Sequence, residues 1–224
     1  MEQTVEYLGI SHTDVLNFLI KKYGYKTYLE IGVGDPRENF CLIECEDKVA
    51  VDPYFDFVDV PNYDEEAIKE INKHVKFRLP SDEFFNYLRE NKTFDIIFID
   101  GLHTEEQCDR DIRNAIKHLS AGGAIVVHDT NPYSSQQAAS VGDYVLGEAW
   151  SGDVYKSVAK LKYMGIPHIT LGEDHGITVI RCPEGFEPDY SKYIEKMDIT
   201  YDEFNERRPY FLNMVSREEF LDRI

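Results

Sequence analysis

The stretch Tyr28–Pro36, which reads YLEIGVGDP, decides the fold. It is an apolar run with one acidic residue, Glu30, followed by Gly32 and Gly34 and then by Asp35-Pro36. An apolar strand that runs into glycines at this spacing is typical of a strand-to-helix turn in an α/β sheet, where another group approaches the backbone closely. The sequence alone leaves four interpretations: a dinucleotide, a phosphate, another nucleoside, or a tight turn that binds nothing.

Strands and helices alternate along the rest of the chain. Strands are predicted at 26–31, 48–52, 75–79, 94–100 and 124–129, and helices at 11–23, 36–44, 64–72, 82–91 (capped by Ser81), 104–119 and 152–163. Two further strands, 168–172 and 176–182, form a closing hairpin. This order predicts an α/β, Rossmann-like, doubly wound sheet of seven strands, mostly parallel with a C-terminal antiparallel strand. We expect one domain over 1–182, with a tail, 183–224, packed on or near it.

The composition disfavours several kinds of binding partner. The net charge of −18 and the pI of about 4.7 disfavour nucleic acid and anionic membrane surfaces. No apolar run reaches the roughly 18 residues of a membrane span, and the acidic N-terminus does not read as a signal peptide. The four cysteines lack the paired spacing of a zinc site, so reduced thiols and a cytoplasmic location are expected. The sequence leaves open whether the chain forms a homodimer.

Polar side chains gather where the predicted strands end. In an open α/β sheet these carboxyl ends meet at one edge, where ligands bind. Asp52 ends the second strand, 20 positions after Gly32, a separation suited to an acceptor for two ribose hydroxyls. The other residues expected at this edge are Glu30, Gly32, Gly34, Asp35, Ser81, Asp82, Asp100, His103, His128 and Asp129.

The charges around the glycines decide between the ligands. A dinucleotide fingerprint needs a third glycine, and Arg37 stands at that position. Glu30 and Asp35 would repel a pyrophosphate, and the Gly-Lys-Ser/Thr of a phosphate loop is absent. With Asp52, the pattern favours a nucleoside that carries a positive tail.

The ordered set of motifs resembles the class I S-adenosylmethionine-dependent methyltransferases, within their branch of small-molecule and sugar O-methyltransferases. The resemblance runs from about Lys26 to Cys182 and rests on YLEIGVGDP, VAVDPYFD, Ser81-Asp82, FDIIFIDGLHTEEQCDRDIRNAIKHLSAGGAIVVHDTNP and GDVYKSVAKLK. The segment from Phe94 to Pro132 is the most specific of these.

The resemblance implies a role for each residue at the sheet edge. Glu30, Gly32 and Gly34 would line the methionine part of S-adenosylmethionine, with Asp35 close by. Asp52 would hold the ribose, and Ser81 and Asp82 would face the adenine. Asp100 would lie below the sulfonium, whose positive charge suits the carboxylates there.

Methyl transfer to a hydroxyl needs help in removing the hydroxyl proton. The candidate catalytic residues are Asp100, His103, His128 and Asp129. Related O-methyltransferases often hold a divalent ion here, which implies a metal such as Mg²⁺ on Asp100, His128 and Asp129. This chain departs from that pattern in having His128 before Asp129 and Thr130 after it. A metal-free mechanism with His128 or His103 as base therefore stays equally open. His103 also has a purely structural interpretation, as a residue that caps or packs on the following helix.

The remaining histidines and the long loop receive simpler interpretations. His12, His74, His118 and His168 are predicted to be surface or packing residues without partners, and Asp174-His175-Gly176 is predicted to be a turn. The loop 131–150 has the length of a lid or binding loop, and its Tyr133, Tyr144 and Trp150 offer flat faces to a ring. The sequence thus predicts an S-adenosylmethionine-dependent O-methyltransferase acting on a small polar acceptor, a sugar or glycan residue. The alternatives are a catechol- or phenol-type enzyme and a catalytically silent cofactor-binding module.

Overall fold

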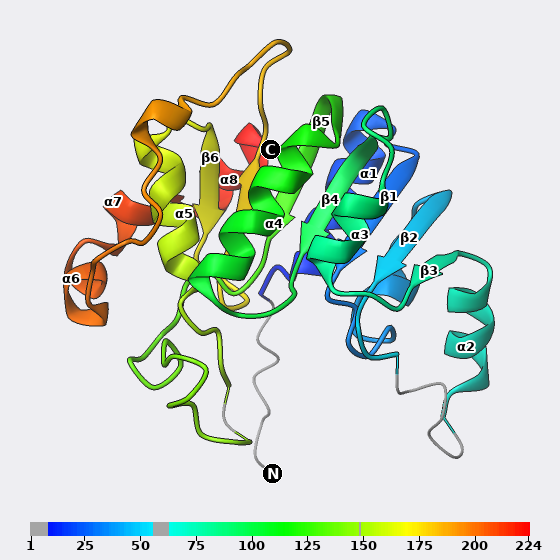
Figure 1. Cartoon of the computed structure of the whole chain (residues 1–224), viewed down its shortest axis with the longest axis horizontal. Helices are drawn as coiled ribbons and strands as arrows, with labels where there is room; N and C mark the ends of the chain where they lie inside the picture. The colour runs from blue at the N-terminus through cyan, green and yellow to red at the C-terminus, as the bar shows by residue number, and fades with distance from the viewer. Residues whose placement is uncertain (1–8, 56–62, 148) are drawn as a thin grey trace.

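The fold is an eight-stranded sheet with helices on both faces. The computed structural model describes residues 9–55, 63–147 and 149–224 (Figure 1). The strand order is β3-β2-β1-β4-β5-β7-β6-β8. The strands are β1 (Thr27–Ile31), β2 (Asp47–Val51), β3 (Val75–Phe77), β4 (Phe94–Ile99), β5 (Leu119–Val127), β6 (His168–Leu171), β7 (Ile177–Ile180) and β8 (Met214–Val215).

The predicted Rossmann-like topology is confirmed. β1 pairs in parallel with β2 and β4, β4 with β5, and β2 with β3. β7 is antiparallel to both β5 and β6, as expected of the closing hairpin. The eighth strand is an addition to the predicted seven: β8 pairs in parallel with β6 over only two residue pairs. Two residues are too few to show an alternating pattern in a sequence.

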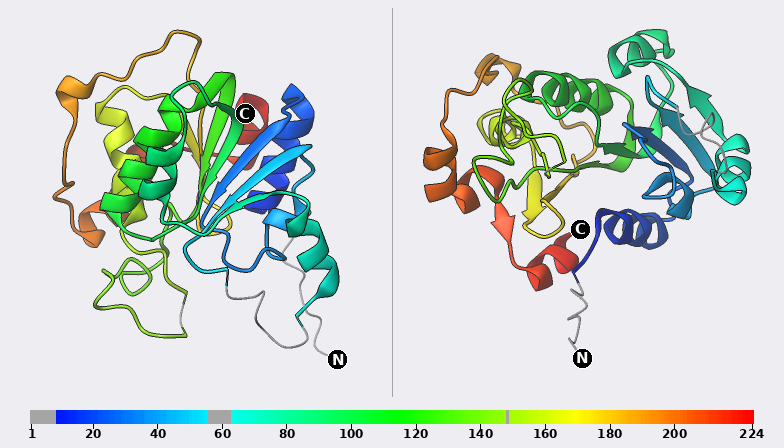
Figure 2. Two further views of the ribbon diagram at one scale, coloured as in Figure 1. Left: turned by 45° about the vertical axis from the view of Figure 1, so that its right-hand side comes forward. Right: turned by 90° about the horizontal axis from the view of Figure 1, so that it is seen from below.

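Helices lie on both faces of the sheet (Figure 2), and a hydrophobic layer packs between the helices and each face. One face packs against α3 (Ser81–Tyr87), α4 (Glu105–Lys117), α5 (Val154–Tyr163), α6 (Tyr201–Glu206) and α7 (Arg208–Leu212). The other face packs against α1 (His12–Tyr23), α2 (Glu65–Asn72) and α8 (Arg217–Arg223). Neighbouring strand residues alternate between the layers: Leu29 and Ile31 join the first and Tyr28 the second. Among the described residues, no helix has the length and hydropathy of a membrane-spanning segment.

Three predicted elements differ most from the structure. The predicted helix 36–44 is only a 3₁₀ turn, η1 (Phe40–Leu42), because the buried Lys48 ammonium takes the carbonyls of Phe40 (2.9 Å) and Ile43 (3.2 Å). Ser81 does not cap α3 but begins it after Pro80, and the helix ends at Tyr87. Strand β5 begins at Leu119 and not at 124, so Gly122 and Gly123 lie inside the strand.

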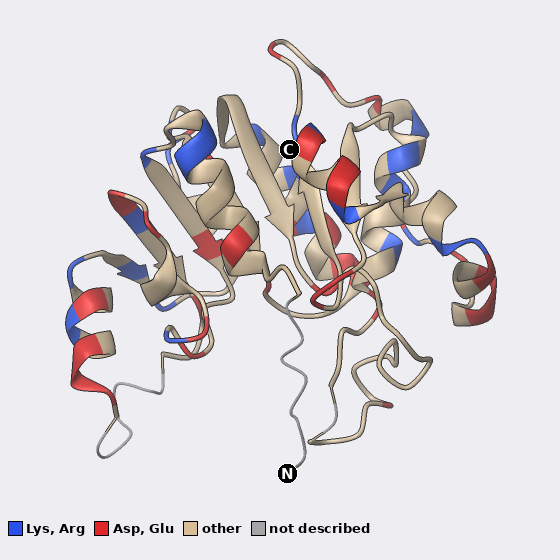
Figure 3. Cartoon of the chain, turned by 180° about the vertical axis from the view of Figure 1, so that it is seen from behind, with Lys and Arg blue, Asp and Glu red and all other residues tan. Residues whose placement is uncertain are grey.

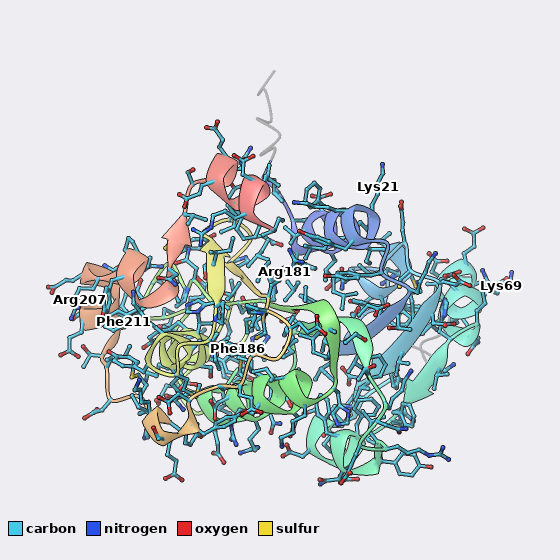
Figure 4. All side chains as sticks on the ribbon, turned by 90° about the horizontal axis from the view of Figure 1, so that it is seen from above. Lys21, Lys69, Arg181, Phe186, Arg207 and Phe211 are labelled. Atoms are coloured by element: carbon cyan, nitrogen blue, oxygen red, sulfur yellow. The ribbon has the colours of Figure 1, made fainter. Side chains whose placement is uncertain are left out.

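The last forty residues contribute to both layers. After η3 (Tyr190–Lys192), the segment supplies Phe204, Phe211 and Leu212 to one hydrophobic cluster. Phe220 and Ile224 join the cluster on the opposite face. Arg207 and Phe211 lie together at one end of the molecule, and Lys69 of α2 lies at the other (Figure 4). Lysines and arginines are spread over several helices and do not gather into one basic face (Figure 3).

Candidate active site

A pocket of about 560 Å³ opens at the carboxyl ends of β1, β2 and β4. All three strands point toward the lower edge in Figure 1, so the loops after them meet there. Six of the eight predicted cofactor residues line this pocket: Gly32, Gly34, Asp35, Asp52, Ser81 and Asp100. The edge of the parallel sheet therefore brings together residues that lie up to 68 positions apart in the chain.

The two glycines that follow β1 have different roles. Gly32 has φ +84°, and a Cβ at this position would lie 2.1 Å from the carbonyl oxygen of Asp100. The group that approaches Gly32 is therefore the protein's own backbone at the end of β4. Gly34 has φ +52° and no atom within 4 Å of a Cβ, so its missing side chain leaves the pocket open. Its N–H donates to Asp52 Oδ2 at 3.0 Å.

Asp52 holds the loops on both sides of the pocket. Its Oδ2 accepts from Gly34, and its Oδ1 accepts from the N–H of Tyr54 at 2.7 Å. The residue is 9% exposed and lines the pocket. An ionised carboxylate has about four acceptor positions, so two remain for hydroxyls of a ligand.

Glu30 and Asp82 lie outside the pocket lining. Glu30 is buried, and its Oε2 accepts from the Tyr28 hydroxyl and from Asn39 Nδ2. Burial, the largest effect, raises the pKa of Glu30 to about 8, against hydrogen bonds that lower it, so burial favours the uncharged form of Glu30. Asp82 instead forms an ion pair with Arg110 (3.2 Å) at the start of α3.

Gln107 is a pocket residue that sequence reasoning missed. Thr104 caps α4, and its side chain accepts from the Gln107 N–H. The Gln107 side chain, however, lines the pocket, and its Nε2 donates to Ser81 Oγ (3.0 Å) and to Asp111 Oδ1 (3.1 Å). Together with the apolar walls of Leu79 and Leu102, it makes the Ser81 end of the pocket a mixed polar and apolar surface.

The four predicted catalytic residues come together beside the pocket. His103 Nε2 lies 3.3 Å from Asp100 Oδ1 and 3.2 Å from Asp129 Oδ2. His128 Nδ1 lies 3.3 Å from Asp100 Oδ2 and 3.7 Å from Asp129 Oδ2. Asp100 therefore belongs both to the pocket and to this His–Asp cluster, which we define as Asp100, His103, His128 and Asp129. These contacts place His103 in the cluster.

The outer nitrogen of each imidazole is fixed by a backbone carbonyl. His103 Nδ1 donates to the carbonyl of Trp150 at 2.8 Å, and His128 Nε2 donates to that of Asp174 at 2.9 Å. The inner nitrogens therefore face the two carboxylates. Asp129 adopts φ +58°, a strained conformation for a non-glycine residue, and its Oδ1 accepts from Ser151 Oγ at 2.7 Å.

The two carboxylates make the cluster strongly attractive to positive charge. Burial alone would lower the pKa of His103, but Asp100 and Asp129 raise it to about 9. The pKa of His128 lies well above its ordinary value for the same reason, although burial opposes it. In turn, the imidazoles hold the pKa of Asp100 well below its usual range despite burial. The two carboxylates therefore favour the protonated form of both imidazoles.

His12 and Asp174 support this cluster. The sequence did not predict this role for either residue. The prediction that His12 has no partner is wrong, because its Nδ1 lies 2.6 Å from Asp174 Oδ2 and its ring lies 4.4 Å from that of His128. Asp174 does lie in a turn, with φ +47°, but this turn follows β6 at the same edge where the parallel strands end. The position of this turn at the sheet edge was the signal from which the sequence could have predicted the role of Asp174.

Three further histidines that were predicted to have no partner, His74, His118 and His168, lie apart from the cluster but do have partners. His118 Nδ1 donates to the Lys92 carbonyl and His168 Nδ1 to that of Ile166, consistent with packing roles. His74 Nε2 lies 3.3 Å from Glu70 Oε1.

Aromatic side chains from the loop after β5 lie next to the cluster. The Trp150 ring lies 5.2 Å from that of His103, and Tyr144 stacks on Trp150 at 4.7 Å. Tyr133 is 54% exposed, and its hydroxyl donates to the Gly172 carbonyl at 3.2 Å. The predicted flat faces of Tyr144 and Trp150 therefore occur beside the His–Asp cluster, whereas the Tyr133 ring lies 5.5 Å from that of His175.

Residues 19–130, half of the chain, match a family model described as a methyltransferase domain. The chain belongs to this methyltransferase family. Its fold is similar to the SAH-bound methyltransferase of Podospora anserina, with 18% identity, a TM-score of 0.56, and coverage of 77% of this chain and 78% of that one. It is also similar to an O-methyltransferase from Bacillus cereus in complex with SAH, with 16% identity, a TM-score of 0.52, and coverage of 77% and 82%. A comparison with curated proteins found no match.

Proposed function

We propose that this methyltransferase binds S-adenosylmethionine in the 560 Å³ pocket and transfers its methyl group to a hydroxyl of a small polar acceptor, a sugar or glycan residue. The observation that carries the proposal is the position of Asp100. It lines the pocket, and it is also a member of the His–Asp cluster. A methyl group held in the pocket would thus lie next to groups that can receive a hydroxyl proton.

The pocket residues match the parts of the cofactor in order. Asp52 has free acceptor positions for the ribose hydroxyls. The Ser81 end, with its apolar walls, suits the adenine. The methionine part would run along the open backbone at Gly34, where no side chain obstructs it. The sulfonium would lie near Asp100, whose low pKa keeps it negative and thus attractive to the positive sulfur.

The reaction is an in-line displacement. The hydroxyl oxygen forms a bond to the methyl carbon as the carbon–sulfur bond breaks, and that electron pair stays on sulfur. The hydroxyl proton leaves to a carboxylate oxygen of the His–Asp cluster, because the neighbouring imidazoles favour their own protonated form. Positioned proton transfer of this kind contributes roughly 10²–10⁴-fold to a rate. Holding the two reactants at near-contact distance contributes further, by removing the entropy cost of their encounter.

The surroundings of the cluster favour a sugar acceptor. A sugar ring presents hydroxyls on its edge and C–H groups on its face, and Tyr144 and Trp150 offer flat surfaces to such a face. The histidines and carboxylates next to them offer hydrogen-bonding partners to the hydroxyls. A catechol would use the same cluster, so acceptor identity is decided by experiment.

The test is methyl transfer from ¹³C-methyl-labelled S-adenosylmethionine to panels of sugars, nucleotide sugars and catechols, read by NMR. We expect a labelled O-methyl product from a sugar acceptor, and a loss of at least about 100-fold with Asp100→Asn. Asp47→Asn, an exposed carboxylate at the opposite end of β2, serves as the matched control and should retain full activity. A labelled O-methyl product from a catechol alone would change the proposed acceptor to a catechol. A labelled methyl group on nitrogen would overturn the proposed O-methylation.

A further inference from the structure

We infer that His175 is a specificity-determining residue, whose ring N–H at Nε2 donates to a second oxygen of the acceptor, beside the hydroxyl that is methylated. The residue lies between β6 and β7, in a segment that the sequence predicts only to be a turn. The role of His175 toward the acceptor rests on the proposed function. The free N–H itself follows from the hydrogen bonds of the protein alone.

The position of the proton on the His175 ring is fixed by Gln137. This glutamine is 5% exposed, and its Oε1 accepts from the Tyr133 N–H at 2.7 Å. A backbone N–H can only donate, so the amide oxygen of Gln137 faces Tyr133 and its Nε2 faces His175. His175 Nδ1 lies 2.6 Å from that Nε2 and accepts from it. An imidazole that accepts at Nδ1 carries its proton on Nε2, which is therefore a donor.

The protein leaves this donor unused. Within residues 9–55, 63–147 and 149–224, no group accepts a hydrogen bond from His175 Nε2, and the atom is accessible from outside. By contrast, both ring nitrogens of His103 and of His128 lie next to oxygens of the protein. His175 is thus the histidine at this edge of the sheet that has a hydrogen bond to offer to a ligand.

The backbone holds His175 in a fixed and strained conformation. Its N–H donates to the Tyr133 hydroxyl at 3.2 Å, and its carbonyl accepts from the Asn131 N–H at 2.7 Å. Its φ is +57°, in the left-handed region that non-glycine residues rarely adopt. The next residue, Gly176, has φ +98°, and a Cβ there would lie 2.4 Å from the backbone nitrogen of Asn131. Strained residues of this kind cluster at functional sites, where they hold a group ready for a ligand.

The strand order places His175 on the acceptor side of the His–Asp cluster. The cofactor pocket lies at the ends of β1, β2 and β4, and the cluster lies at the ends of β4 and β5. β7 is the next strand in the sheet, and it begins beside the end of β5. In an in-line displacement the acceptor oxygen lies opposite the sulfur, so the acceptor reaches the cluster from the side of β7. There the His175 ring lies 6.5 Å from that of His128 and 5.5 Å from that of Tyr133.

This arrangement suits an acceptor that carries two oxygens close together. One hydroxyl would lie at the carboxylates of the cluster, and the second oxygen would accept from His175 Nε2. Neighbouring oxygens of a sugar ring supply such a pair, and the exposed ring of Tyr133 offers a surface to the C–H groups beside them. An acceptor without the second oxygen would displace water from the N–H and leave it unpaired, which lowers affinity.

The first test is NMR of the wild type labelled with ¹⁵N-histidine, which reports the position of the proton on each ring. The His175 signals are assigned by their loss in His175→Asn, and we expect the proton on Nε2 before any acceptor is added. The methyl glycosides of glucose, galactose, mannose and rhamnose, and catechol, are then added in turn in the presence of SAH. At least one of them should shift the Nε2 signal. A proton on Nδ1, or an Nε2 signal that moves with none of these compounds, would overturn the inference.

The second test separates the free N–H from the structural contacts of His175. Asparagine tolerates the left-handed conformation, and its Oδ1 can still accept from Gln137, but no atom of it replaces Nε2. We expect His175→Asn to raise the KM of the acceptor about 3–10-fold, the effect of one neutral hydrogen bond, with unchanged affinity for S-adenosylmethionine. His74→Asn, on the distant α2–β3 connection, is the matched control and should keep the wild-type KM.

A deoxy analogue of the acceptor completes the test. Removing the second oxygen should raise KM by a similar factor in the wild type and by little in His175→Asn, because the two changes delete the same hydrogen bond. A wild-type KM in His175→Asn would reject this inference and leave the proposed function standing. No methyl transfer by the wild type to any acceptor would reject the proposed function, and the NMR titration would still decide the inference. That titration also decides it if His175→Asn fails to fold.

Discussion

Replacing Gly32 by alanine should destabilise the fold, whereas the same change at Gly34 should act mainly on cofactor binding. Both glycines have positive φ, +84° and +52°, so each alanine bears the cost of a left-handed backbone, about 1–2 kcal/mol. At Gly32 the added Cβ also meets the Asp100 carbonyl oxygen at 2.1 Å. That atom belongs to the backbone at the end of β4 and cannot swing aside.

The clash sets the difference between the two variants. Overpacking a rigid site typically costs about 1–3 kcal/mol, so Gly32→Ala should lower the free energy of unfolding by about 2–5 kcal/mol in total. Gly34→Ala meets no atom within 4 Å and should lower it by about 1–2 kcal/mol. Its methyl group lines the pocket, however, so affinity for S-adenosylmethionine should fall at least tenfold.

Urea unfolding of both variants and of the wild type measures these free energies, and equal m-values confirm that the unfolded states are comparable. Calorimetric titration with S-adenosylmethionine gives the affinities. The reasoning would be refuted if Gly32→Ala were no less stable than Gly34→Ala, or if Gly34→Ala bound the cofactor as tightly as the wild type.

Three further predictions concern buried groups. Because burial raises the pKa of Glu30 from 4.5 to about 8, the folded state holds a proton that the unfolded state releases. Stability should therefore fall as pH rises from about 4.5 to 8, by up to roughly 5 kcal/mol, and Glu30→Gln should remove that part of the pH dependence of urea unfolding. Lys160→Met leaves Glu105, its partner at 2.8 Å, buried and unpaired, and should cost about 3–5 kcal/mol, most of it recovered by adding Glu105→Gln. Phe220→Ala should cost about 3–5 kcal/mol in thermal or urea unfolding, since its ring is fully buried; an unchanged stability would show that α8 is dispensable.

The architecture could be predicted from the sequence because the strands are strongly apolar and end in polar residues. The runs at β1, β4 and β5 are buried on both faces, and such runs stand out from their surroundings. Parallel strands end at one edge, so Asp52, Asp100 and His128 could be brought together without knowing any contact between them. Topology thus predicts that the members of the His–Asp cluster lie at one edge of the sheet.

The sequence could not show which side chains at that edge would be enclosed. Glu30 follows β1's alternation onto the face of Tyr28, where Asn39 closes over it, and this depends on how the segment after β1 folds. The Lys48 ammonium stops a predicted helix by binding two carbonyls, a contact between separate segments. His12 and Asp174 lie 162 residues apart, and no local pattern connects them.

The most direct test of the central claim is calorimetric titration of the wild type with S-adenosylmethionine, in parallel with Asp52→Ala and the control Asp47→Ala. The account predicts one site per chain in the wild type and in Asp47→Ala. It also predicts affinity at least about 100-fold weaker in Asp52→Ala, because hydrogen bonds to a charged acceptor contribute roughly 1.5–3 kcal/mol each. No binding by the wild type, or equal binding by all three proteins, would contradict the assignment of the pocket.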